Sequence, residues 1–554
     1  MKKKVIDELN NINDDLIDKS MSIDSKEKLI EAKSKEKKGL GAIFGWLTAG
    51  VVTVGLIVFG VVFFTNNNVL SNNTNKTNEV EVDISKYLSE YTMKGNGLEE
   101  FDLYFMKLNN DGKNKVYSPL SIKYALEMLS EGAKGDTKAQ IDAILGDYKA
   151  GKYFNNKNIS FANAMFINES VKNDVNKDYT KNLMDKFNAE VIYDSFKDAK
   201  KVNNWVSEKT LKLIGDLLTD DAVRDKLYFL VNALAIDMEW TNKIAEDGIW
   251  VDYANEDYSF FMGPYNSGYD ETMIKFNGKK EVPMLHFASV FNNYDIVKAL
   301  GEDYIKETLK KAYAEYKKTD EYDPENEPEE LSEEYFKDYI KALNNNYHKS
   351  ANSTEYMFYV DDNLKVIAKD LKKYGSTQLQ YVQIMPTKEN LDKYIEKMTA
   401  EDLNKIINNL KETKNETFKE GVITEINGYI APFKMDYELD LTSNLNTLGV
   451  KNIFDFDKAD LSGIMNGTHA ISDVLHKATI ELTNDGIKAA AATAIGGLGD
   501  DNSGFHYEFD VPVEKIDLTF DKPFIYLVRD KVTGEIWFAG STYEIISPEF
   551  VLAK

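Results

Sequence analysis

The sequence predicts a mixed α/β domain preceded by one transmembrane helix. Residues 39–65 carry no charged side chain. Residues 118–141 have apolar residues at helical intervals, which predicts a helix that ends at Gly132 and Gly135. The aromatic and aliphatic runs at 227–240 and 379–387 are typical of buried central strands. Residues 515–544 alternate around the turn sequence KVTGE, which predicts a C-terminal hairpin.

Composition limits the classes of protein that the chain can belong to. With 554 residues, 43% of them hydrophobic and 29% charged, the chain can bury a large core. A net charge of −25 argues against a nucleic-acid partner, because phosphates would repel such a surface. The absence of cysteine excludes disulfides, thiolate catalysis and cysteine-bound metal centres.

The apolar run at 39–65 is predicted to be a transmembrane helix. As a helix it would span roughly 40 Å, which is enough to cross a bilayer with some tilt. A buried core helix and a cleaved signal peptide are the alternatives. A core helix this long rarely lacks a polar face, and no small-x-small cleavage pattern follows the run.

Charges on either side of this run orient the predicted helix. Four lysines crowd its N-terminal flank: Lys33, Lys35, Lys37 and Lys38. By the positive-inside rule, residues 1–38 form a cytoplasmic tail and residues after 65 lie outside the cell. The Asn/Thr-rich residues 66–83 are predicted to be a flexible linker to a domain at 84–554. We therefore expect a single-pass protein of the plasma membrane, with the lipid bilayer as a partner of 39–65.

The usual sequence signatures of an enzyme are missing. The chain has five histidines, and none forms H-E-x-x-H or another close metal-ligand spacing. It also lacks a G-x-S-x-G elbow, a P-loop and a G-x-G-x-x-G fingerprint. No cofactor and no metal site are predicted, and an enzyme is the least favoured class.

Residues from about 300 to 353 differ from their surroundings. They are rich in lysine and glutamate and include KKTDEYDPENEPEELSEEYF. This pattern predicts a solvated helical insertion with an acidic turn, and a specific partner site is the alternative.

Several segments taken in order resemble the serpin family, from about Ile84 to the end of the chain. VYSPLSIKYALEMLSEGAKGDTKAQI looks like the family's N-terminal helix motif, and SFANAMFINES, FNAEVIYDSF, VNNWVSEKTLKLIGDLL, FLVNALAIDMEW and VPML follow it. The match ends with LTSNLNTLGVKNIFDFDKADLSGI, VLHKATIELTNDGIKAAAATA and FDKPFIYLVRDKVTGEIWFAG. The resemblance implies an α/β (α+β) serpin fold with three β-sheets, about nine helices and an exposed reactive loop near the C-terminus.

The resemblance also assigns roles to polar residues scattered along the chain. Trp240 matches the aromatic residue at the breach, where loop insertion begins. The shutter, a polar cluster beneath the central sheet that lets two strands part, would comprise Ser118, Ser121, Asn203, Asn232 and His476. Without the resemblance, the two serines would read as helix caps and His476 as a core histidine.

The hinge of the reactive loop would be residues 486–493, and its side chains suit insertion into a sheet. Counted in alternation, Ile487, Ala489, Ala491 and Thr493 face inward and are compact and uncharged, whereas Lys488 faces outward. Gly486 permits the backbone reversal. Propensity alone would instead favour a capped alanine-rich helix. The full hinge comprises Gly486, Ile487, Lys488, Ala489, Ala490, Ala491, Ala492 and Thr493.

Three departures from the family pattern affect this loop. Ile487 stands where the family usually has Thr or Ser, and Asn484 stands where it commonly has Glu. The stretch from Gly486 to Phe520 is also longer than usual. Counting back from Phe520 puts the scissile bond near 507–512. Counting forward from the hinge, which we favour, puts it at Leu498, Gly499, Asp500 or Asp501.

The sequence thus predicts a serine-type endopeptidase inhibitor. It would act as a suicide substrate on serine or cysteine proteases by inserting its loop into the central sheet. Its Lys/Asn-rich, proline-poor composition points to display on a bacterial cell surface. The rival prediction is a non-inhibitory serpin-fold binding or adhesion module.

Overall fold

The computed structural model describes two parts of the chain. These are residues 56–66 and residues 100–546, apart from 147, 154, 157, 211, 213–216, 242–272, 349–355, 374, 376, 483–504, 506 and 508. The predicted cytoplasmic tail, residues 67–83 of the predicted linker, the hinge and the favoured cleavage residues therefore lie outside the described residues.

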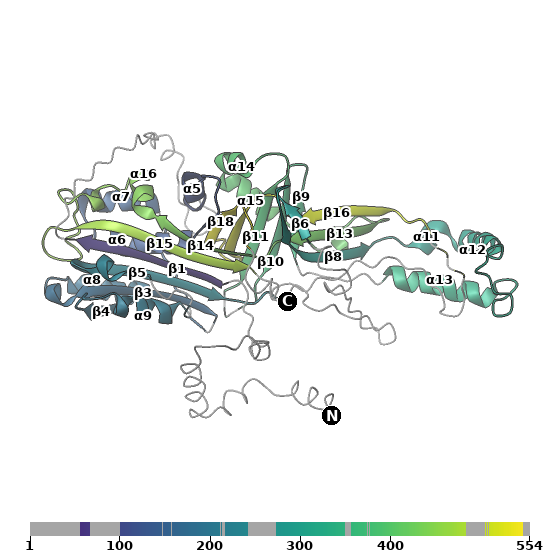
Figure 1. The fold of residues 1–554 in the computed structure, drawn as a ribbon, viewed down its shortest axis with the longest axis horizontal. Helices are drawn as coiled ribbons and strands as arrows, with labels where there is room; N and C mark the ends of the chain where they lie inside the picture. Colours follow the sequence, from purple (N-terminus) through teal and green to yellow (C-terminus); the bar gives the residue numbers. More distant parts are fainter. Residues whose placement is uncertain are drawn as a thin grey trace, which may run out of the picture. The chain divides into compact units, whose positions relative to one another are not determined.

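A six-stranded sheet, called the central sheet below, lies at the left of Figure 1. All neighbouring strands are antiparallel except β3 and β4. Its strands, in spatial order, are β14 (Phe433–Asp440), β15 (Ala470–Leu482), β1 (Leu56–Asn66), β5 (Lys226–Asp237), β3 (Ile159–Asn168) and β4 (Glu190–Asp194).

A seven-stranded sheet and two smaller sheets complete the β structure. The seven-stranded sheet runs β12 (Lys411–Glu412), β9 (Met357–Val360), β10 (Leu364–Asp370), β11 (Leu379–Pro386), β17 (Phe524–Asp530), β18 (Ile536–Thr542) and β2 (Lys115–Tyr117). The others are β16 (Val513–Thr519), β13 (Ile423–Ile430) and β8 (Leu285–Asn292), and the pair β6 (Met273–Phe276) and β7 (Lys280–Pro283). The predicted strands at 227–240 and 379–387 and the C-terminal hairpin are confirmed as β5, β11 and β17–β18.

Twelve α-helices lie in the part of the chain that the structure describes. They are α5 (Glu100–Leu108), α6 (Pro119–Ser130), α7 (Gly135–Leu145), α8 (Lys177–Phe187), α9 (Lys200–Lys209), α10 (Asp220–Val223), α11 (Ile296–Leu300), α12 (Glu302–Tyr316), α13 (Glu333–His348), α14 (Leu391–Lys397), α15 (Ala400–Asn408) and α16 (Leu441–Thr447). Short 3-10 turns lie at Glu169–Val171, Asn415–Thr417 and Asn452–Phe454. The helix expected after Ser118 and ending at Gly132 and Gly135 is confirmed as α6, and a second helix, α7, begins at Gly135.

The central sheet is buried on both faces. On one face, α9 packs Val202 and Trp205 against alternate residues of β3 and β5 such as Phe166 and Val231. The remaining residues of those strands join the main core, to which α6 and the seven-stranded sheet also contribute. Burial on both faces explains why β5 reads as a continuous apolar run.

The helix predicted over 39–65 is wrong for residues 56–65, because residues 56–66 form β1. Residues 39–55 lie outside the described part of the chain. Within the described part, no helix is both long enough and apolar enough to cross a membrane. The segment LIVFGVVFFTN is rich in β-branched and aromatic residues, so it suits a buried strand as well as an apolar helix.

Candidate functional site in the central sheet

The most informative feature of the central sheet is the place of β1, between β15 and β5. Ile57 pairs with Ile480 of β15 and with Ile236 of β5, and the antiparallel pairing continues along the strand to Asn66. Each ladder shifts register once, near Thr65. β15 and β5 therefore run parallel to each other with one strand between them.

β15 leads directly into the predicted reactive loop. It ends at Leu482, and the hinge begins at Gly486. A loop that folds back beside β15 would pair with it antiparallel, as the second strand of a hairpin does. β1 already has that position and that direction, because its first residues lie opposite the end of β15.

Ser118 and His476 meet beneath the sheet. Ser118 caps α6, and its Oγ accepts a hydrogen bond from the Ser121 backbone N–H at 3.2 Å. The Ser118 backbone N–H donates to Nε2 of His476 at 3.3 Å. Burial lowers the pKa of His476 well below its usual range, so the imidazole is neutral. Ser118 is thus both the helix cap and a neighbour of the histidine, whereas Ser121 lies in the first turn of α6 and supplies the capped N–H.

Asn232 lies at the same level of the sheet but on β5. Its Nδ2 donates to Oδ1 of Asn163 on β3 at 2.7 Å, and Asn163 in turn donates to the Phe187 carbonyl at 2.8 Å. Val61 of β1 pairs with both Asn232 and His476, so one strand separates the two polar residues. Asn163 was missed by sequence reasoning, although an asparagine within the apolar run SFANAMF was a usable signal.

The structure does not bring Asn203 to this cluster. Asn203 is on α9, which covers the face of β5 that carries Val231 and Ala233, whereas Asn232 alternates to the other face. Its side chain accepts from the Leu217 and Leu218 backbone N–H groups at 3.1 and 2.9 Å and donates to the Leu218 carbonyl at 2.8 Å. Asn203 therefore holds the chain that follows α9.

Trp240 lies just beyond the end of β5, near the first residues of β1. It forms an isolated bridge with Leu371, and its ring meets the Tyr381 ring edge-on at 5.7 Å. Beside it, Lys372 forms an ion pair with Glu239. The buried tryptophan thus joins the end of β5 to the seven-stranded sheet where a strand inserted beside β15 would start.

A buried charge cluster joins α5, α6 and the start of β18. Nζ of Lys123 lies 3.0 Å from Oδ1 of Asp102 and 3.5 Å from Oε1 of Glu535. The Lys123 ammonium also lies 5.1 Å from the centre of the Tyr148 ring. Sequence reasoning missed this cluster, because a lysine among the apolar residues of α6 reads as a solvent-facing residue.

The segment that follows the predicted cleavage region packs on the insertion. Phe505 and Phe509 are 3% and 8% exposed, and the Phe505 ring meets the Tyr313 ring of α12 edge-on at 4.9 Å. The Tyr339 hydroxyl of α13 donates to the Tyr507 carbonyl at 2.9 Å. This packing disfavours cleavage at 507–512, because a protease needs an accessible extended substrate. The same packing explains why the predicted reactive loop is long, because its last part covers helices α12 and α13.

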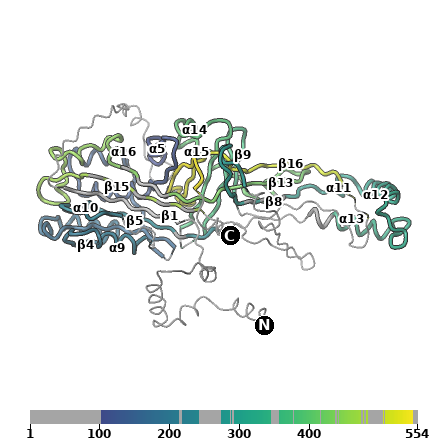
Figure 2. The backbone as a smooth tube through the Cα atoms, in the orientation of Figure 1, coloured from purple at the N-terminus to yellow at the C-terminus, as the bar shows by residue number. Residues whose placement is uncertain are grey.

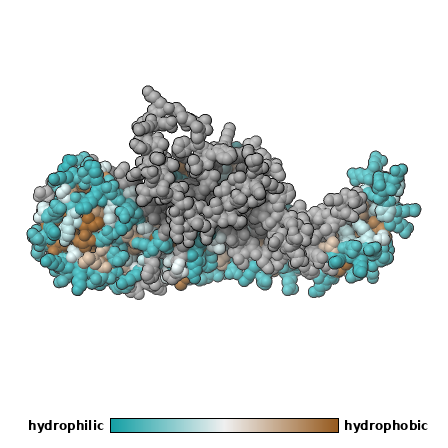
Figure 3. Space-filling model, turned by 90° about the horizontal axis from the view of Figure 1, so that it is seen from below, coloured by the Kyte–Doolittle hydropathy of each residue, from teal (hydrophilic) through white to brown (hydrophobic). Residues whose placement is uncertain are grey.

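The inserted helices continue from the three-stranded sheet (Figure 2). From 320 to 334 the turn between α12 and α13 has acidic residues and no lysine or arginine. The turn is anchored by Lys317, whose ammonium donates to the Glu329 carbonyl at 2.6 Å. The surface of these helices is mostly hydrophilic, as the teal region at the right of Figure 3 shows.

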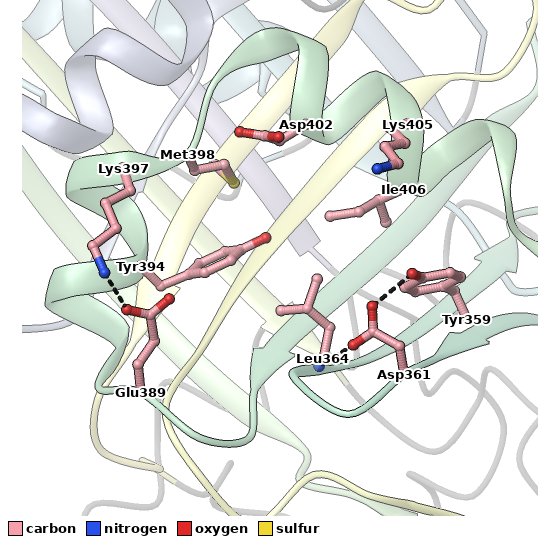
Figure 4. A pocket seen from close by; sticks show the side chains of 10 residues that line it. All are labelled: Tyr359, Asp361, Leu364, Glu389, Tyr394, Lys397, Met398, Asp402, Lys405 and Ile406. Carbon is pink, nitrogen blue, oxygen red and sulfur yellow. Dashed lines mark hydrogen bonds and ion pairs between the residues drawn. The ribbon is translucent and has the colours of Figure 1, made fainter.

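One pocket of about 250 Å³ lies at the edge of the seven-stranded sheet, between α14, α15 and the β9–β10 turn (Figure 4). Its polar groups largely pair with one another. The Tyr359 hydroxyl donates to Asp361 at 2.6 Å, and Lys397 bonds Glu389 at 2.8 Å. The pocket belongs to a different sheet from β1 and takes no part in strand insertion.

Comparisons with known proteins agree with this architecture. The family model described as "Serpin (serine protease inhibitor)" matches residues 100–248 and 339–545. The unmatched stretch between them contains α11 and α12, so most of the insertion is foreign to the family model.

Similar proteins come from distant organisms. Human Serpin B4 is 26% identical over 480 residues, covering 79% of this chain and 96% of that protein. The human leukocyte elastase inhibitor is 25% identical over 439 residues, covering 78% and 93%. An uncharacterized serpin-like protein of the archaeon Methanosarcina acetivorans is 22% identical over 478 residues, covering 82% and 88%. These sources give no support for a bacterial origin.

A solved structure shows the same fold. The native state of the thermophilic serpin tengpin aligns with a TM-score of 0.50 and 20% identity, covering 83% of this chain and 98% of that one. The fold, the order of the matched segments and the family model lead to one conclusion: this chain belongs to the serpin family.

Proposed function

We propose that this serpin is a suicide inhibitor of serine proteases, with cysteine proteases as a second target class. One observation carries the proposal: β15 leads into a hinge of small residues, beside a position between β15 and β5 that holds one added strand, β1, antiparallel to both. The printed name of the leukocyte elastase inhibitor supports the same activity in a relative.

The proposed mechanism follows from substrate chemistry and strand pairing. The protease's serine or cysteine attacks the carbonyl carbon of the scissile residue, the peptide C–N bond breaks, and the new amine takes up a proton. The acyl-enzyme then holds the protease on the cut end of the loop. Pairing of that end beside β15 carries the protease away and distorts its active site before water can hydrolyse the ester or thioester.

Cleavage at 498–501 fits this mechanism better than cleavage at 507–512. Residues 486–498 would supply an inserted strand about as long as β1, which has 11 residues. The acidic and small residues at 498–501 would suit a protease that prefers acidic or small residues at the cleavage site. Residues from Phe505 onward would remain on α12 and α13 after the cut, as a fixed anchor for the C-terminal fragment.

We also propose that, in a state in which β1 has left the sheet, the run 39–65 forms a membrane helix that displays the protein outside the cell, with residues 1–38 in the cytoplasm. The charge-free run and the lysines before it support this localisation. Display requires β1 to leave the sheet, because residues 56–65 cannot be helix and strand at once. Alkaline extraction of membranes should leave the full chain in the pellet, and release into the supernatant would refute the anchor.

A second candidate function is a non-inhibitory binding module, and β1 itself favours it. A sheet whose central position is already filled has no room for a cleaved loop, and the acidic turn at 320–334 offers a separate surface.

Incubation of the full chain with a panel of serine and cysteine proteases separates the two functions. An inhibitor forms a covalent complex that survives denaturing electrophoresis, and mass spectrometry of the released C-terminal peptide identifies the scissile bond. A binding module is merely cleaved, or left intact, and gains no thermal stability after cleavage.

A further inference from the structure

β1 closes the central sheet as its third strand, although it comes from far outside the matched family region. It pairs with β15 on one side and with β5 on the other, so its backbone groups are used in both ladders. From Ile57 to Phe63 the register with both neighbours is unbroken. The association is therefore a full strand insertion along the length of the sheet.

The β1 position can hold one strand only. Neighbouring strands lie about 4.8 Å apart, and β1 takes up the whole spacing between β15 and β5. A loop folding back from Leu482 would need the same hydrogen-bonding edge of β15, in the same direction. The two segments are mutually exclusive by sterics and by backbone pairing.

We propose that residues 56–66 are a removable internal strand, which blocks loop insertion while it remains in the sheet and permits insertion once it leaves. The proposal rests on the proposed inhibitory function. It converts the two candidate functions into two states of one molecule: an insertion-blocked state with β1 in place, and an active state with the β1 position empty or taken by the loop.

The polar residues beneath β1 favour its reversible removal. Asn232 is 1% exposed, and its Oδ1 has no hydrogen-bond partner among the described residues. Oγ of Ser121 is likewise buried and unpartnered in that part of the chain. Such groups destabilise the state that contains them.

Departure of β1 gives Asn232 a route to a partner. Without β1, strands β5 and β15 could pair directly as parallel neighbours. Val61 pairs with both Asn232 and His476, so these two residues lie two strand spacings apart in the sheet with β1. If β5 and β15 paired directly at the same register, the two residues would lie one strand spacing apart. Closure would therefore place the buried, unpartnered Oδ1 of Asn232 one strand spacing from another polar side chain.

The absence of cysteine allows a direct test in the full chain. Val58 pairs with Thr479 in the β1–β15 ladder, and paired residues of antiparallel strands lie within disulfide range. The double variant Val58→Cys with Thr479→Cys should form a disulfide on mild oxidation. The control Val58→Cys with Asp473→Cys displaces the second cysteine six residues along β15, roughly 20 Å away, and should stay reduced.

The locked protein then tests the competition. Oxidised Val58→Cys/Thr479→Cys should lose covalent complex formation and should show no rise in melting temperature after its loop is cut. Reduction should restore both. Lack of the disulfide, or equal yields in the test pair and the control pair, overturns the proposal, as does a locked form that traps proteases as well as the reduced form.

The same data separate this proposal from the proposed function. If the reduced form gains thermal stability on loop cleavage and the oxidised form does not, yet neither traps a protease, then β1 blocks insertion but the chain is no inhibitor. If complexes form and the disulfide never does, the chain is an inhibitor and the removable strand is wrong.

Discussion

Replacement of Lys123 by methionine should destabilise the protein more than loss of almost any other single charge. The ammonium of Lys123 lies 3.0 Å from Asp102 and 3.5 Å from Glu535, and the three side chains are 0%, 0% and 5% exposed. Methionine keeps much of the volume and removes the positive charge, so two carboxylates remain buried without their cation. Breaking a buried pair in this way costs about 3–5 kcal/mol.

The matched control is Lys186→Met, which removes an equally close ion pair at the surface. Lys186 lies 2.7 Å from Glu131, but its side chain is 53% exposed, so its loss should change the free energy of unfolding by about 0–1 kcal/mol. Urea unfolding of the full-length variants, followed by circular dichroism, gives the comparison.

A rescue variant tests whether charge is the cause. Lys123→Met with Asp102→Asn and Glu535→Gln carries none of the three charges and should recover part of the lost stability. Equal small effects of Lys123→Met and Lys186→Met would refute the argument, because they would show that water reaches the carboxylates. No recovery in the triple variant would show that packing, rather than charge, is what Lys123 supplies.

Three further outcomes are expected. The pKa of His476 is depressed in the fold, so only the unfolded chain takes up this proton as the pH drops below about 6.5, and the free energy of unfolding falls with acidification. His476→Gln should reduce this fall by up to about 1.4 kcal/mol per pH unit. Denaturant titrations of both proteins at pH 7.5 and 5.5 measure the difference. Ala489→Arg should turn the inhibitor into a substrate, whereas Ala490→Arg, whose side chain alternates outward, should retain complex formation; equal complex yields on gels would contradict strand insertion of the hinge. Phe505→Ser should expose 505–512 to limited proteolysis by subtilisin, and a cleavage pattern unchanged by mass spectrometry would show that the packing on Tyr313 does not protect this segment.

The local sequence pattern was sufficient to predict those strands and helices whose burial in the fold is the burial that their pattern usually indicates. The apolar runs of β5 and β11 and the alternation of β17 and β18 predicted strands, because their side-chain period matches the burial they have in the fold. The cap at Ser118 was also readable, since a serine before Pro119 is a local signal for a helix start.

Contacts between distant segments could not be read in this way. Nothing in the sequence near Lys123 indicates that Asp102 and Glu535 lie beside it. Asn203 can be excluded from the cluster of Asn232 and His476 only once α9 is known to pack on the other face of β5. The extra length of the loop is explained only by the packing of Phe505 and Phe509 on α12 and α13, which the sequence does not indicate.

Short stretches of sequence were enough to predict the family, the helix after Ser118, the buried strands and the small residues of the hinge, because each of these signals lies in residues near one another in the chain. The tertiary structure alone decided the conformation of residues 56–66. An apolar, β-branched segment gains about as much by burial in a helix as in a strand, and only the free hydrogen-bonding edges of β15 and β5 select the strand.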